Sequence, residues 1–145
     1  MAAITFDYVG TELTQTRAEN PSPLAPIESG ARVRIKKFSY TAAGAVSSGS
    51  QIEFAEFPNR VSIIGGAITS LTLSNSATLD VGWTLTATPV DTNKAVFASA
   101  KTAAAAFLPK LVTTTGATTV FGTTGVGALV AGNVIEGYIL YVENS

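Results

Sequence analysis

Large apolar side chains alternate with small or polar ones along residues 79–88, which read Leu-Asp-Val-Gly-Trp-Thr-Leu-Thr-Ala-Thr. Leu79, Val81, Trp83 and Leu85 occupy every second position, which is the period of a half-buried β-strand. The other face carries Asp, Gly and Thr, which tolerate contact with water. We therefore expect this strand at the centre of the fold, with the only tryptophan, Trp83, pointing inward.

Strand-like patterns recur along most of the chain, and turns rich in Gly, Pro, Asn and Ser separate them. They cover residues 4–9, 32–40, 50–57, 61–73, 112–121 and 134–142. The last of these is apolar on both faces, so we expect it either in the middle of a two-sheet core or buried against a second chain. Short strands with such turns predict an all-β fold, either an antiparallel sandwich or a jelly-roll-like barrel.

Two segments depart from simple alternation. In residues 32–40 the apolar positions change parity at Lys36-Lys37, which predicts a β-bulge or a strand that changes face. An Ala-rich stretch further on spaces its apolar residues by about three and four positions. This spacing predicts one short helix over residues 93–107, which ends at Pro109.

The N-terminal part of the chain has a different character. Pro21, Pro23 and Pro26 lie close together, and neither a helix nor a central strand tolerates that spacing. We therefore divide the chain into an extended N-terminal arm, residues 1–31, and a β-sandwich or barrel domain, residues 32–145. Such an arm is either a flexible tail or a segment that lies across a neighbouring subunit.

The composition excludes several classes of function. Nine Lys and Arg residues against ten Asp and Glu residues give a net charge of -1, so no strong field attracts nucleic acid or an anionic membrane. The chain has no cysteine and no histidine, which removes disulfides, thiolate metal sites and the commonest general base. Charged residues make up only 13%, which indicates either a surface coated with hydroxyl groups or, as we favour, a surface covered by partners. We expect synthesis in the cytoplasm and no cofactor.

No group of residues has the spacing of a catalytic or ligand-binding site. Glu53 and Glu56 lie three apart, which on a strand sends them to opposite faces, so a pair of catalytic carboxylates would require a bulge. Asp80 is expected to form a structural salt bridge with Arg60, Arg32 or Arg34. Residues 122–132 are rich in glycine and predict a loop, because the Gly-Lys-Ser/Thr ending of a phosphate loop is missing. The scattered acids do not suggest a metal site.

The basic residues form one cluster in the sequence. It consists of Arg32, Arg34, Lys36 and Lys37. Binding of single-stranded nucleic acid would need aromatic residues on the same face. The simpler interpretation is an exposed charged face that keeps an edge strand from pairing with other molecules.

Three segments together resemble one family of virion proteins. They are Arg32–Lys36 with Phe38–Tyr40, Thr78–Trp83, and Gly137–Val142. In this order and spacing they are similar to small head decoration, or cement, proteins of tailed bacteriophages, including those of cyanophages. The similarity covers about residues 30–145 and consists of strand patterns, not catalytic motifs. Where such families have an acidic Ala/Asp-rich segment after the central strand, this chain has Lys94, Lys101 and a run of alanines.

The resemblance implies a non-enzymatic structural protein, made in the host cytoplasm, that binds the outside of an icosahedral head as an oligomer, often a trimer. Its partners would be the major capsid protein and copies of itself, with no nucleic acid, membrane or small-molecule substrate. The predicted contact residues are Pro21, Pro23, Pro26, Arg32, Arg34, Lys36, Tyr138 and Tyr141. Two alternatives stay open: a tail-spike or fibre module that binds glycans through Trp83, Tyr138 or Tyr141, and a glycosidase or lyase that uses Glu53 or Glu56.

Overall fold

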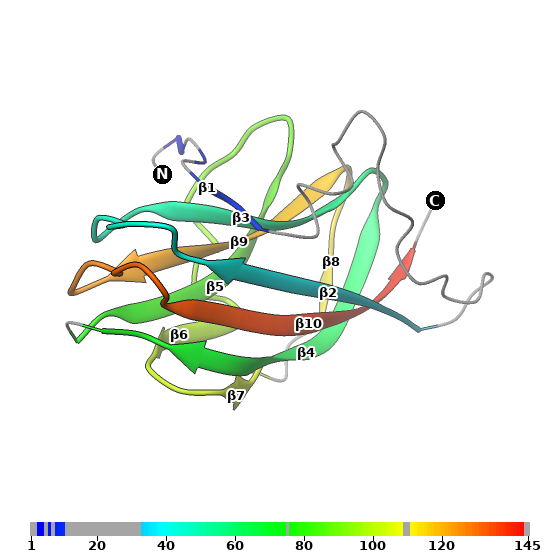
Figure 1. The fold of residues 1–145 in the computed structure, drawn as a ribbon. Helices are drawn as coiled ribbons and strands as arrows, with labels where there is room; N and C mark the ends of the chain where they lie inside the picture. The colour runs from blue at the N-terminus through cyan, green and yellow to red at the C-terminus, as the bar shows by residue number, and fades with distance from the viewer. Residues whose placement is uncertain are drawn as a thin grey trace, which may run out of the picture.

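The computed structural model describes residues 3, 4, 6, 8–10, 33–74, 76–108 and 111–143. Their strands are β1 (Tyr8–Val9), β2 (Arg34–Thr41), β3 (Gln51–Phe57), β4 (Val61–Thr72), β5 (Thr78–Leu85), β6 (Ala98–Lys101), β7 (Ala105–Ala106), β8 (Val112–Thr113), β9 (Thr118–Gly125) and β10 (Val134–Glu143). The β9 sheet has the order β1-β3-β9-β5-β6, and the β10 sheet has the order β2-β10-β4-β7, with β8 also paired to β4. The two sheets pack as a sandwich (Figure 1), which confirms the predicted all-β class.

Most connections pass from one sheet to the other. The chain changes sheet between β2 and β3, β3 and β4, β4 and β5, β6 and β7, β8 and β9, and β9 and β10. Strand pairs are antiparallel, except that β1 runs parallel to β3. This winding is that of a jelly roll.

Aromatic rings fill the space between the sheets. Phe38 of β2 stacks on Phe54 of β3 with ring centroids 4.5 Å apart, and both are almost completely buried. Burial of such a side chain contributes about 2–3 kcal/mol. A Cβ atom on Gly122 or Gly137 would collide with the ring of Phe54 or Phe38, respectively. Glycine therefore lets each strand approach the ring that packs on it.

The strand that contains Trp83 is confirmed, but it is not central. β5 lies between β9 and β6, and β9 occupies the middle of the sheet. Trp83 packs against the core and stays partly exposed. The sequence pattern does not show that β9 lies in the middle of the sheet, because several of its buried residues are threonines. These are Thr118, Thr119, Thr123 and Thr124.

The predicted helix over residues 93–107 is wrong. This segment contains β6, which pairs with β5, and β7, which pairs with β4, so the chain crosses between the sheets here. Ala100 has a φ of 49°, which a right-handed helix does not allow. Phe97 and Phe107 stack with ring centroids 5.3 Å apart, and the N–H of Leu108 donates to the carbonyl of Phe97. The helix-like spacing therefore comes from a segment that folds back on itself.

The predicted bulge at Lys36-Lys37 is also wrong. β2 pairs with β10 without a shift in register along its whole length. Its even-numbered residues are the more buried ones and face the other sheet, while its odd-numbered residues face outward. The apparent change of parity arises because the inward face begins with two basic residues, Arg34 and Lys36, before its aromatic residues.

The predicted glycine-rich loop over 122–132 begins later than expected. β9 continues to Gly125, and residues 126–133 connect it to β10. In β4, the register against β10 shifts near Gly65, so this glycine-containing strand bends without ending. No helix of a length and hydropathy suited to crossing a membrane occurs among the described residues.

Candidate interaction surface

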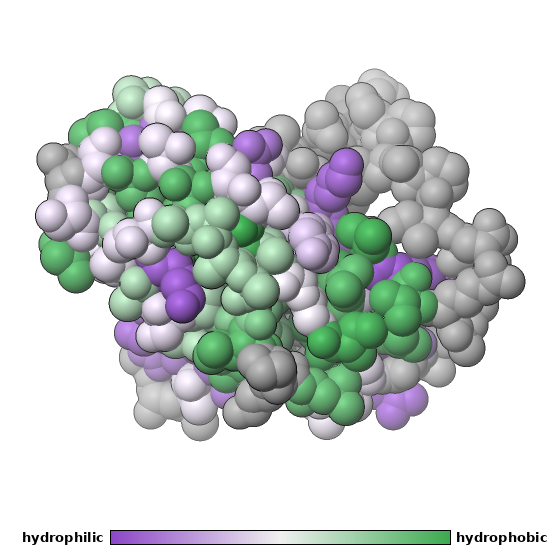
Figure 2. Space-filling model, turned by 90° about the horizontal axis from the view of Figure 1, so that it is seen from below, coloured by the Kyte–Doolittle hydropathy of each residue, from purple (hydrophilic) through white to green (hydrophobic). Residues whose placement is uncertain are grey.

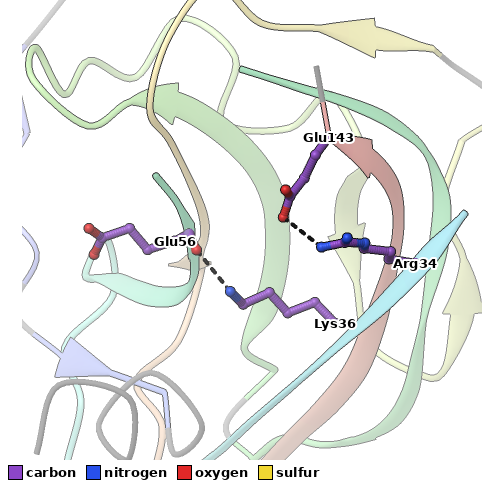
Figure 3. Close-up of polar contacts among 4 residues, drawn as sticks. All are labelled: Arg34, Lys36, Glu56 and Glu143. Carbon is purple, nitrogen blue, oxygen red and sulfur yellow. Dashed lines mark hydrogen bonds and ion pairs between the residues drawn. The ribbon is translucent and has the colours of Figure 1, made fainter. Parts of the chain in front are cut away.

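Arg34 and Lys36 point into the gap between the two sheets at one end of the sandwich (Figure 3). Nη1 of Arg34 donates to Oε1 of Glu143 at 3.0 Å, and Nζ of Lys36 donates to the backbone carbonyl of Glu56 at 2.9 Å. The ammonium group of Lys36 also lies 5.0 Å from the ring centroid of Phe57. The expectation of an exposed basic face is therefore wrong for these two residues.

Tyr141 completes this inner cluster. Its ring meets that of Phe57 edge to face, with centroids 4.7 Å apart, and it is 8% exposed. Burial raises the pKa of Tyr141, and Glu143 acts in the same direction while Arg34 opposes it. Burial lowers the pKa of Lys36, although the nearby carboxylates oppose that shift. These groups close one end of the sandwich and leave no aromatic face free for a ligand.

Asp80 makes a different contact from the predicted salt bridge. Its Oδ1 accepts a hydrogen bond from the backbone N–H of Ala100 at 2.6 Å, while Arg34 is held by Glu143. The carboxylate of Asp80 thus fixes the turn in which Ala100 has its positive φ.

β10 has a second apolar face that points away from the core. Its residues Tyr138, Leu140 and Val142 are only half-buried. In the register with β2, Leu140 lies opposite Ile35, which is 46% exposed. We define the outer sheet face by these residues and their apolar neighbours on the β10 sheet. It comprises Val33, Ile35, Ile64, Tyr138, Leu140 and Val142.

Figure 2 shows hydrophobic residues gathered on the right half of the molecule, the half that holds the start of β4 and the end of β10 in Figure 1. Val33 is 52% exposed and Ile64 40%. Ile64 protrudes because it falls at the irregularity in register between β4 and β10. The described residues leave this apolar surface uncovered.

A shallow groove of about 350 Å³ adjoins the apolar part of the outer sheet face. It runs across β2, β10 and β4. Its lining residues are Ile35, Lys37, Phe38, Ser39, Thr69, Glu136, Gly137 and Tyr138. The groove therefore places Lys37, Glu136, two hydroxyl groups and the phenol ring of Tyr138 beside the apolar residues of the outer sheet face.

Chains with a similar fold occur in the solved structures of two phage capsids. No protein-family model matches the chain, and no curated protein matches its sequence. A chain in the capsid of Ralstonia phage GP4 superposes with a TM-score of 0.64 at 17% identity, over 85% of this chain and 92% of that one. A chain of the cyanophage Pam1 capsid asymmetric unit gives a TM-score of 0.61 at 19% identity, over 88% and 96%. The chain shares its fold with these phage capsid chains.

The predicted contact residues fall into separate groups. Pro21, Pro23, Pro26 and Arg32 lie outside the described residues. Arg34, Lys36 and Tyr141 come together in the inner cluster. Tyr138 lies on the outer sheet face, in the groove. Their role in contacts stays a prediction.

The apolar members of the outer sheet face were missed as a group, although their sequence pattern contained a signal. Val33 and Ile35 alternate with basic residues, and Tyr138, Leu140 and Val142 alternate with core residues. Only the register between β2 and β10 brings the two sets onto one face. Sequence alone does not supply that register.

The acidic residues give little support for an enzyme. A pair of catalytic carboxylates formed by Glu53 and Glu56 would require a bulge between them. The register of β3 against β9 does shift between Glu53 and Ala55. However, Glu53 is 5% exposed, and Val9 of β1 is paired with it. Within the described ranges, no three acidic, histidine or cysteine residues gather as metal ligands.

Proposed function

We propose that this chain is a non-enzymatic structural protein of a phage virion, which binds the outside of an icosahedral head as an oligomer and stabilises the shell. The observation that carries the proposal is the apolar outer sheet face, which the described part of the chain leaves uncovered. Exposed apolar patches mark sites of protein association. The shared fold with two phage capsid chains supports the same function.

In this proposal the outer sheet face meets the major capsid protein. Apolar residues lie at its centre, and Lys37 and Glu136 lie beside them in the groove. An apolar centre with a polar rim is the usual anatomy of a protein interface. A protein that binds only the assembled shell stabilises it by mass action. An oligomer, which we propose is a trimer, contacts several shell subunits at once and gains avidity.

Cosedimentation of the purified protein with phage heads tests this function. The wild type should bind in a saturable manner. Ile35→Glu should weaken binding at least about tenfold, because a carboxylate on the apolar face would lose its water on docking. Leu108→Glu is the matched control, since Leu108 is 48% exposed and Ile35 46%, and Leu108 lies outside the outer sheet face. Equal binding by both variants and the wild type would remove this face from the interface.

We also propose that the arm contacts the shell or a neighbouring subunit, as its prolines predict. Replacement of residues 11–31 by a Gly/Ser linker of equal length keeps β1, which pairs with β3. The variant should keep its oligomeric mass and lose affinity for heads. Unchanged cosedimentation would assign the contact to the sandwich alone.

A second candidate is glycan binding at the groove. It is favoured by Tyr138, whose half-buried ring lines the groove with Lys37, Ser39 and Glu136, because sugars bind to an aromatic face flanked by polar groups. Tyr141 is too buried to serve. Retention of a polysaccharide by the wild type, and its loss in Tyr138→Ala, would favour this candidate over shell binding.

A further inference from the structure

Three loops at one end of the sandwich carry no charged residue, although Lys101, the last residue of β6, lies close to this end, opposite Leu79. The loops 42–50, 73–77 and 126–133 join strands at this end, and Figure 1 shows them together at the left. None of the three contains Asp, Glu, Lys or Arg. We call these loops the loop end. The opposite end holds the Arg34–Glu143 ion pair.

Hydrogen bonds join the loop end into one unit. Val46 and Leu129 form a β-bridge between two of the loops. The side chain of Asn133 reaches the third loop, because its Oδ1 accepts from the N–H of Ser74 and its Nδ2 donates to the hydroxyl of Ser74. The same Oδ1 accepts from the N–H of Val130. The surface is thus formed before any partner binds.

Two valines project from this surface. Val126 is 78% exposed, and Val130 is 38% exposed. Their neighbours at the surface are Ala, Gly and Ser residues such as Ala43, Ser48 and Ala131. Surface loops of soluble proteins usually carry charges, because charge keeps proteins apart in solution. Uncharged loops with projecting valines therefore point to a covered surface.

The absence of charge also indicates what covers it. In a cyclic oligomer, the surface nearest the rotation axis meets the same surface of other copies. A charge placed there faces an identical charge, and this repulsion disfavours association. A neutral surface meets its own copies without this penalty. A contact with a different protein places no such restriction on charge.

We propose that copies of this chain associate through the loop end, around a rotation axis that passes close to Val126 and Val130. This inference rests on the proposed function for the existence of the oligomer, and it names the surface involved. The apolar part of the outer sheet face lies toward the other end of the β10 sheet, since Ile35 and Leu140 are at the start of β2 and near the end of β10. It therefore stays free for the shell.

Light scattering on purified variants tests this arrangement. Val126→Glu and Val126→Lys should each shift the protein from the oligomeric mass to the monomer mass, with the dissociation constant raised at least about tenfold. Val126 has a φ of 64°, a region that β-branched residues such as valine tolerate least. Glu and Lys are not β-branched, so neither substitution adds backbone strain. An equimolar mixture of the two variants should regain oligomer, since a mixed trimer has two Glu–Lys contacts and only one contact between like charges.

Several controls keep the inference separate from folding and from shell binding. Val130→Glu repeats the test at a position without positive φ, and Leu108→Glu should keep the oligomeric mass. Circular dichroism confirms that each variant is folded. A monomeric wild type, oligomeric single variants, or a mixture that stays monomeric would each overturn the inference. Failure of the proposed function appears elsewhere, as wild-type oligomers that do not cosediment with heads.

Discussion

Lys36 places an ammonium group between the two sheets, where burial lowers its pKa although Glu56 and Glu143 oppose the shift. The unfolded chain therefore holds this proton more tightly than the folded one. For that reason the free energy of unfolding rises as the pH increases toward the ordinary lysine value of 10.5. The folded structure therefore accommodates the charged form of Lys36 less well than the unfolded chain does.

Replacement of Lys36 by methionine tests this consequence. Lys36→Met should be at least as stable as the wild type at pH 7, because methionine fills the space without a charge to desolvate. The difference should shrink at about pH 9.5, where more of the wild-type lysine is neutral in the folded state. Urea unfolding at both pH values measures it. A loss of more than about 2 kcal/mol at pH 7 would mean that the contacts with Glu56 and Phe57 outweigh the burial cost.

Two glycines allow a matched test of packing. A Cβ atom on Gly122 would lie 2.6 Å from the ring of Phe54, whereas one on Gly116 would meet nothing within 4 Å. We expect Gly122→Ala to lower the free energy of unfolding by about 1–3 kcal/mol through overpacking. Gly116→Ala should change it by no more than about 0.5 kcal/mol. Similar values for the two variants in denaturant titrations would contradict the close packing of Phe54 on β9.

At the scale of elements, the crossing from β6 to β7 joins the two sheets. Phe107 packs on Phe97 and covers Gly66 of β4, and its N–H donates to the carbonyl of Gly66. The segment that includes β6 and β7 thus adds an edge strand to each sheet and an aromatic contact between them.

Truncation of Phe107 measures this contribution. Phe107→Ala should lower the free energy of unfolding by about 3–5 kcal/mol, because it leaves a cavity beside Phe97. Leu108→Ala, next to it and 48% exposed, should have an effect within about 0.5 kcal/mol. A small loss in Phe107→Ala, seen in thermal or urea unfolding, would show that the crossing is not part of the cooperative core.

Strand patterns made the fold class predictable, because alternation in β5 and β10 depends only on neighbouring residues. Three features depended on distant contacts and were not predictable. The Ala-rich stretch folds as strands because β4 and β5 pair with it. Arg34 and Lys36 turn inward because Glu143 and the carbonyl of Glu56 receive them. The outer sheet face depends on the register of β2 with β10.

At the scale of the whole molecule, two surfaces of different chemistry lie toward opposite ends of the β10 sheet. The outer sheet face is apolar with charged residues beside it, which suits the proposed contact with a different protein. The loop end is free of charge, which suits the proposed contact with copies of the same chain. Ile35→Glu should therefore weaken shell binding and keep the oligomer. Val126→Glu should break the oligomer and leave the outer sheet face of each monomer able to bind the shell, although without the avidity of the oligomer.

Cryo-electron microscopy of phage heads assembled with and without this chain tests the central claim most directly. The account predicts symmetric densities on the outer surface of the shell that fit the sandwich, have the outer sheet face against the capsid, and vanish when the chain is omitted. Identical outer surfaces in the two preparations, or density for the chain only in the tail, would contradict it.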